Sequence, residues 1–132
     1  MADSKLTNQA GNAFWSAPEV IQGRHYDLSA DIFSLGIVLV ELLTHFDPSD
    51  LDQVPRKKDM GVDVDSVVFP ADSPADLIPL IRSCLSVIPT ERPTSASVVN
   101  KLSEVKDLLH SQLRDKSHTP IERHSKKSSK NQ

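Results

Sequence analysis

The part of this chain best suited to recognise another molecule is residues 11–16, where Gly11 and Asn12 precede Phe14 and Trp15. A glycine permits a tight turn, and two neighbouring aromatic rings can form a wall against a bound peptide. The chemistry that these residues predict is therefore non-covalent binding of a polypeptide. Packing of both rings into a hydrophobic core is an equally good interpretation.

Residue types that ligate metals or act as nucleophiles show no comparable pattern. The five histidines are scattered without the spacing of a metal site, and Cys84 is the single cysteine. One cysteine cannot close an intrachain disulfide, which is typical of a reducing compartment, and residues 1–5 are too polar for a signal peptide. We therefore expect no metal site and a cytoplasmic protein, with the nucleus as the alternative location.

Length and composition predict one soluble globular domain. The chain has 132 residues, of which 38% are hydrophobic and 25% are charged. The charge is uneven, because residues 1–113 contain nine Lys or Arg against sixteen Asp or Glu, whereas residues 114–132 contain six against two. An acidic body cannot neutralise nucleic-acid phosphates well, so we expect no nucleic-acid binding by the folded part.

The element that must position the aromatic residues is a hydrophobic run at residues 28–43, with eleven apolar side chains in sixteen positions. It falls short of the roughly twenty residues of a membrane span, so we expect no span. The run instead predicts a central buried helix near residues 28–44, covered on nearly all faces. Asp31 lies near its start, where a carboxylate can interact with free backbone N–H groups.

A second helix is expected near residues 74–87. Ser73 followed by Pro74 has the form of a helix start, and apolar residues then recur at helical spacing. Pro79 lacks a backbone N–H and leaves the first residue of this helix open. The preceding residues 44–72 contain three prolines and seven aspartates, which predicts loops with one short helix at most.

A third helix is expected near residues 95–111, with Thr94 or Ser95 as its cap and apolar residues at helical spacing. The chain on either side of the domain has no apolar period. We predict a disordered or loop-like start at residues 1–10 and a disordered basic tail at residues 114–132. No function is assigned to either.

Three short strings, in order along the chain, are similar to strings in the second half of a protein kinase domain. They are Ala17-Pro18-Glu19, the run Asp31-Ile32-Phe33-Ser34-Leu35-Gly36, and Arg92-Pro93-Thr94. The resemblance implies that residues 11–113 form an incomplete, mainly α, helical C-terminal lobe of the kinase fold. Within this family, the tryptophan at position 15 resembles the residue found in the tyrosine-kinase-like branch of the Ser/Thr kinases.

The resemblance also implies which residues meet a protein substrate. They lie in the loop that precedes Ala17-Pro18-Glu19 and are Gly11, Asn12, Phe14 and Trp15. Asn12 departs from the family, because Ser/Thr kinases usually carry there a Thr that contacts the catalytic Asp. This departure puts full activity in doubt even for a longer parent protein.

Two further roles are implied for charged residues. Glu19 would form a structural ion pair with Arg92, although Ile88 departs from the Asp that the family usually carries in the string around this arginine. Asp31 would anchor the catalytic loop by accepting hydrogen bonds from its backbone. For Glu19 and Arg92, an exposed surface charge is the alternative. For Asp31, the alternative is an interaction with the free backbone N–H groups at the start of its helix.

The family's ATP and metal motifs are a glycine-rich loop, a Lys, H-R-D and D-F-G, and all of them precede A-P-E. Residues 1–16 contain none of them. Phosphoryl transfer depends on these groups for positioning and charge stabilisation. We therefore expect no catalytic residue and no cofactor in this chain, and MgATP only in a longer parent.

Three functional hypotheses remain open. The first is a fragment of a Ser/Thr kinase whose parent phosphorylates proteins. The second is a non-catalytic kinase-lobe remnant, a pseudokinase, that binds a protein partner or itself through apolar surface left uncovered. The third is a relic without a biochemical role.

Overall fold

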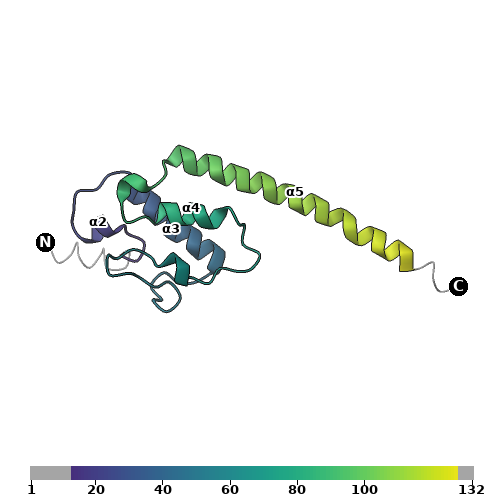
Figure 1. The fold of residues 1–132 in the computed structure, drawn as a ribbon, viewed down its shortest axis with the longest axis horizontal. Helices are drawn as coiled ribbons and strands as arrows, with labels where there is room; N and C mark the ends of the chain where they lie inside the picture. The colour runs from purple at the N-terminus through teal and green to yellow at the C-terminus, as the bar shows by residue number, and fades with distance from the viewer. Residues whose placement is uncertain (1–12, 128–132) are drawn as a thin grey trace.

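The computed structural model describes the backbone of residues 13–127 and the side chains of residues 13–116. Its elements, in order along the chain, are α2 (Pro18–Ile21), α3 (Ser29–Thr44), η1 (Val64–Ser66), α4 (Leu77–Cys84), η2 (Pro89–Glu91) and α5 (Ser95–Lys127). α3 and α4 pack side by side in the body of the molecule, and α5 projects from it (Figure 1). The described residues contain no strand, only one isolated bridge between Arg56 and Val62. The prediction of a mainly helical fold is confirmed.

α3 is the core of the molecule, as its apolar run predicts. Phe33 and Ile37 have no exposed surface, and Leu39 and Val40 are buried beside them. The helix begins at Ser29 and ends at Thr44, so the expected bounds of 28–44 are confirmed. Within the described part of the chain, no helix is long and apolar enough to cross a membrane.

Gly36 allows α3 and the end of α4 to approach closely. A Cβ atom at this position would lie 2.8 Å from Leu85 Cδ2 and 3.0 Å from Cys84 Cβ, closer than van der Waals contact permits. Cys84 is fully buried here, and burial raises the pKa of its thiol to about 11. The cysteine therefore acts as a small apolar side chain in this contact.

α4 is shorter than the sequence predicts, because it begins at Leu77 instead of Pro74 and ends at Cys84 instead of residue 87. Residues before it form a turn in which the Leu77 N–H donates to the Pro74 carbonyl. Pro79 falls in the first turn of the observed helix, where a backbone N–H has no intrahelical acceptor and its absence costs nothing. The later start therefore places this proline where a helix tolerates it.

α5 begins as expected, because the Thr94 hydroxyl accepts a hydrogen bond of 3.2 Å from the Ser97 N–H. It ends at Lys127, however, and not near residue 111. Residues 114–127 are thus helical where we predicted a disordered tail. Adding a residue to an existing helix fixes one residue for each new hydrogen bond, whereas starting a helix fixes several residues for one bond. The helix can therefore continue past its last apolar contact. The remainder of the predicted tail and the predicted start at residues 1–10 lie outside the described residues.

The segment between α3 and α4 contains loops and one short 3-10 helix, as its proline and aspartate content predicts. A tight hairpin is its most regular part. The Lys57 N–H donates to the Gly61 carbonyl at 2.7 Å, and the Asp63 N–H donates to the Pro55 carbonyl at 2.9 Å. Buried Val54, Val62, Val64 and Val67 anchor the segment to the core.

Candidate functional site

The best-defined polar group of the molecule is the pair of Glu19 in α2 and Arg92 after η2. Arg92 Nη1 donates to Glu19 Oε2 at 2.7 Å, and Nη2 donates to Oε1 at 2.8 Å. Glu19 and Arg92 are only 7% and 6% exposed. Residues 73 positions apart thus form a bidentate, buried ion pair, which is the pairing that the resemblance to a kinase lobe implies.

Besides Glu19, Arg92 has partners in two other segments. Its Nε donates to the Ser86 carbonyl at 2.8 Å, and Nη1 also donates to the Ser29 carbonyl at 3.1 Å. Its guanidinium carbon lies 5.2 Å from the centre of the Phe33 ring, a cation–π distance. Arg92 therefore joins α2, the start of α3 and the segment after α4.

The pair stabilises the ionised form of the acid. The hydrogen bonds from Arg92 lower the pKa of Glu19, and burial opposes this effect only in part. A carboxylate that already accepts two short hydrogen bonds is a poor general base. The geometry therefore indicates a structural clamp beside the Ala17-Pro18-Glu19 string and not a reacting group.

Residues 13–16 form a turn that α3 holds from one side. The Ser16 N–H donates to the Ala13 carbonyl at 3.2 Å, which closes the turn. The Ser34 hydroxyl donates to the Trp15 carbonyl at 2.6 Å, and the Trp15 indole Nε1 donates to Glu41 Oε1 at 2.8 Å. Both the backbone and the ring of Trp15 are therefore tied to α3.

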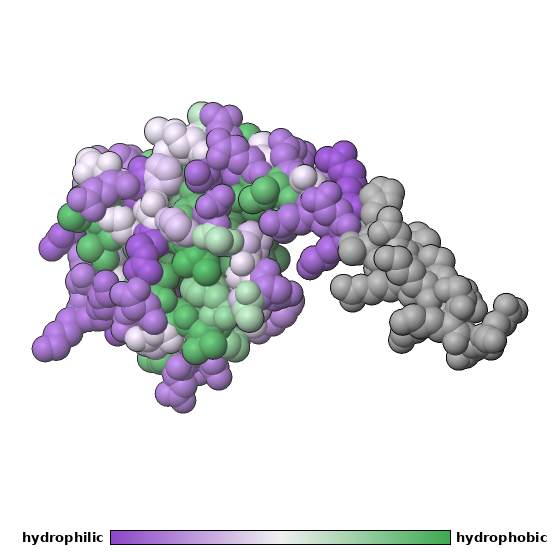
Figure 2. All heavy atoms as spheres, turned by 45° about the vertical axis from the view of Figure 1, so that its right-hand side comes forward, coloured by the Kyte–Doolittle hydropathy of each residue, from purple (hydrophilic) through white to green (hydrophobic). Residues whose placement is uncertain are grey.

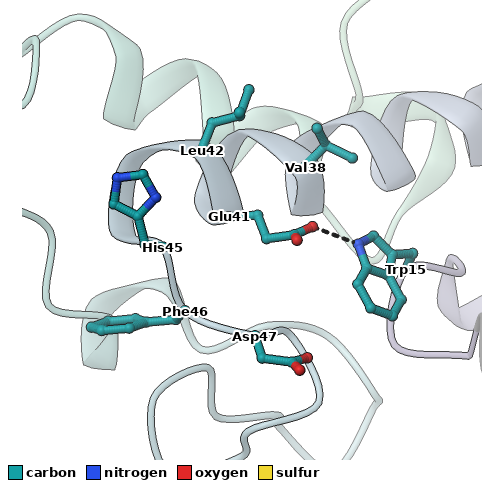
Figure 3. A pocket seen from close by; sticks show the side chains of 7 residues that line it. All are labelled: Trp15, Val38, Glu41, Leu42, His45, Phe46 and Asp47. Carbon is teal, nitrogen blue, oxygen red and sulfur yellow. Dashed lines mark hydrogen bonds between the residues drawn. The ribbon is translucent and has the colours of Figure 1, made fainter.

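Beside Trp15 lies an open depression of about 490 Å³ (Figure 3). It is lined by Trp15, Val38, Glu41, Leu42, His45, Phe46 and Asp47. Leu42 is 65% exposed, a large fraction for an apolar side chain on the central helix. Figure 2 shows apolar side chains gathered over the centre of one face of the body, with polar side chains around them. The site therefore combines an aromatic wall, an apolar floor and a carboxylate.

The other predicted site residues are placed as follows. Gly11 and Asn12 lie outside the described residues, while Phe14 and Trp15 are both half-buried. Asp31 is exposed in the first turn of α3, and no described residue donates a hydrogen bond to its carboxylate. The structure thus brings Trp15 together with α3, the Phe14 carbonyl together with Arg56, and Glu19 together with Arg92, whereas Asp31 takes part in none of these contacts.

Four residues of this region were not singled out from the sequence: Ser34, Glu41, Arg56 and Ser86. Glu41 carried the clearest signal, because it is the one charged residue in the second half of an otherwise apolar helix. The Ser86 hydroxyl accepts from the Ile88 N–H and donates to Glu91 Oε2, each at 3.2 Å, while η2 itself has no side-chain cap at Ile88. Ser34 and Arg56 carried no local signal.

No cluster of three or more His, Cys, Asp or Glu side chains that could hold a metal ion occurs among the described residues. The depression beside Trp15 is lined by aromatic and aliphatic side chains together with Glu41, His45 and Asp47. Such a surface can bind and orient a polypeptide chain.

Comparison with known proteins gives a consistent picture. The sequence model of the protein kinase domain matches residues 1–102. A probable serine/threonine-protein kinase of Dictyostelium discoideum is 38% identical over 104 residues, which are 77% of this chain and 11% of that protein.

Two dual specificity kinases are also similar. Dual specificity testis-specific protein kinase 1 of Rattus norvegicus is 36% identical over 101 residues, covering 75% of this chain and 16% of that protein. Human dual specificity testis-specific protein kinase 2 is 34% identical over 126 residues, covering 93% of this chain and 22% of that protein. The chain thus spans less than a quarter of the length of each relative. Since the kinase domain model matches most of its length, the chain belongs to the protein kinase family.

Proposed function

We propose that this chain is the substrate-facing part of a protein kinase C-lobe, and that the longer parent transfers phosphate from MgATP to Ser or Thr hydroxyls of proteins. The buried Glu19–Arg92 pair is the observation that supports this most directly. It ties the Ala17-Pro18-Glu19 string to the lobe, and the turn at residues 13–16 directly precedes that string. A clamp of this kind keeps a peptide-binding loop in one conformation, which reduces the ordering cost of binding.

MgATP belongs to the parent in this proposal. The described residues include no cluster that could hold a metal ion, and neither Glu19 nor Arg92 is free to react. We therefore assign no step of phosphoryl transfer to the residues of this chain. Their contribution is to position a protein substrate for a reaction carried out by groups elsewhere in the domain.

The first test is to read the transcript upstream of the Met1 codon. An in-frame coding sequence with H-R-D and D-F-G supports the proposal, whereas a stop codon before Met1 contradicts it. The longer protein should then incorporate phosphate from MgATP into Ser- and Thr-containing peptides. The 132-residue chain, assayed in parallel, should show no transfer.

A second candidate function is that of a non-catalytic binding module, and the exposed apolar side chains on α3 favour it. Val38 and Leu42 are 38% and 65% exposed next to Trp15. Apolar surface of this kind on a central helix is stabilised by a protein partner or by a second copy of the chain. Sedimentation of the purified chain at tens of micromolar tests this function, because a well-behaved monomer would count against it. For either function we propose a location in the cytoplasm or the nucleus.

A further inference from the structure

Arg56 is the only described basic side chain with a long-range hydrogen bond to the turn at residues 13–16. Its Nη2 donates to the Phe14 carbonyl at 2.6 Å, across 42 positions of sequence. α3 holds the same turn from Ser34 and Glu41. The turn is thus held from two independent directions, by a helix and by the loop segment that follows it.

Hydrogen bonds on both sides of Arg56 hold its backbone in place. Arg56 forms the bridge with Val62 at the base of the hairpin, and the hydrogen bonds from Lys57 and Asp63 lie on either side of it. Asp59 Oδ1 accepts from the Gly61 N–H at 2.9 Å and stabilises the hairpin's turn. The hairpin therefore presents the guanidinium from a fixed backbone position.

The charge of Arg56 is not compensated by an ion pair with any described residue. Its Nε is buried without a hydrogen-bond partner among these residues. Burial lowers its pKa, and no carboxylate in the described part of the chain counters this effect. Keeping a partly buried, unpaired charge is unfavourable for stability. An apolar residue would be at least as stable here, so stability alone does not account for the arginine.

We propose that Arg56 is a positioning residue for the substrate-facing loop, which it holds through the Phe14 carbonyl so that Trp15 stays beside the depression on α3. The substrate role of the loop rests on the proposed function, whereas the clamp itself does not. Arg92 and Arg56 then have separate tasks. Arg92 ties down the string after the loop, and Arg56 sets the loop itself.

Trp15 provides a direct readout, because it is the only tryptophan of the chain. Arg56→Met removes the guanidinium and keeps most of the side-chain volume. We expect acrylamide quenching of Trp15 fluorescence to increase about twofold, since loss of one hydrogen bond to a charged donor opens the turn more often. Arg56→Lys keeps a charged donor and should restore part of the protection.

Arg82→Met is the matched control. Arg82 lies in α4 and, unlike Arg56, has a carboxylate partner, Asp65. Its side chain is 53% exposed, and no hydrogen bond between described residues joins it to the turn at residues 13–16. It should leave the quenching unchanged. Unfolding in urea, followed by circular dichroism, separates positioning from simple stabilisation. For Arg56→Met we expect a midpoint equal to or above that of the wild type.

Either of two results would overturn the clamp. The first is unchanged quenching in folded Arg56→Met. The second is a lowered urea midpoint with quenching that increases only in proportion to the unfolded fraction. In the longer kinase, Arg56→Met should raise KM for a peptide substrate about fivefold with kcat nearly unchanged, as expected for lost uniform binding. Increased quenching with unchanged KM would keep the clamp and refute the substrate role of the loop.

Discussion

Two arginine–carboxylate pairs of this molecule have nearly the same length and opposite surroundings. Arg92 and Glu19 are 2.7 Å apart with side chains 0% and 9% exposed, whereas Arg82 and Asp65 are 2.8 Å apart with side chains 53% and 79% exposed. The distance between the charges is therefore no guide to what each pair does. Access of water is the difference that decides it.

In the exposed pair, water and salt screen the attraction and both side chains lose rotamer freedom to make it. In the buried pair, the charges have left water, and hydrogen bonds to the Ser86 and Ser29 carbonyls replace part of the lost hydration. Such a pair adds little net stability when complete, but breaking it leaves one buried charge uncompensated. The buried pair consequently ties α2 to the start of α3 and to the segment after α4, whereas the exposed pair joins α4 to η1 at the surface.

The largest expected effect comes from removing one partner of the buried pair. Arg92→Met should lower the free energy of unfolding by about 3 to 5 kcal/mol, because the Glu19 carboxylate stays buried without its donor. Urea unfolding followed by circular dichroism measures this. A loss below about 1 kcal/mol is typical of an exposed ion pair and would contradict the claim that burial gives this pair its larger effect.

Reversing both charges tests whether the two residues act on each other. Glu19→Arg and Arg92→Glu should each destabilise the fold strongly, and the double variant should recover part of the loss, with a coupling of about 0.5 to 3 kcal/mol. Recovery should be incomplete, because a carboxylate at position 92 faces the Ser86 and Ser29 carbonyls. Purely additive losses would mean that the residues do not interact in solution.

Acid should weaken the buried pair specifically. The folded-state pKa of Glu19 lies below its ordinary value of 4.5, so the unfolded chain takes up the proton first. The stability from this pair is therefore present above pH 4.5 and is lost as the pH falls through the folded pKa. Glu19→Gln should show a shallower loss of urea midpoint in that window. Equal slopes for the two proteins would contradict the assignment, since Asp27 and Asp47, whose pKa values are also lowered, are common to both.

The smallest effect is expected at the exposed pair. Arg82→Met should change the free energy of unfolding by at most about 1 kcal/mol, because the pair is screened by water. Any effect should shrink further with added salt, which the same urea titration can measure at two ionic strengths. A loss comparable to that of Arg92→Met would remove the distinction between the two pairs.

Much of the fold could be predicted because its signals are local. The apolar run of α3 predicts a buried helix, and the Thr94 cap and apolar spacing predict where α5 begins. The start of α4 stayed open in the sequence because Ser73-Pro74 and the segment around Pro79 both satisfy local rules for a helix start. Burial of Leu77 and Leu80 in the core accompanies the later start. The end of α5 was misjudged because the prediction required an apolar face that an extended helix does not need.

By itself, the sequence determined the helical core, because the apolar run of α3 is legible in the chain. The pairing of Glu19 with Arg92 was implied by the resemblance of two short strings to a kinase lobe. Only the tertiary structure decided that Glu41 holds the Trp15 ring and that Arg56 holds the Phe14 carbonyl, across 26 and 42 positions. Nothing in the local pattern of a charged residue distinguishes such a role from that of an ordinary surface charge. A charged residue takes such a role only when the fold places it next to one particular hydrogen-bond partner, as it does for Glu41 with the Trp15 indole and for Arg56 with the Phe14 carbonyl.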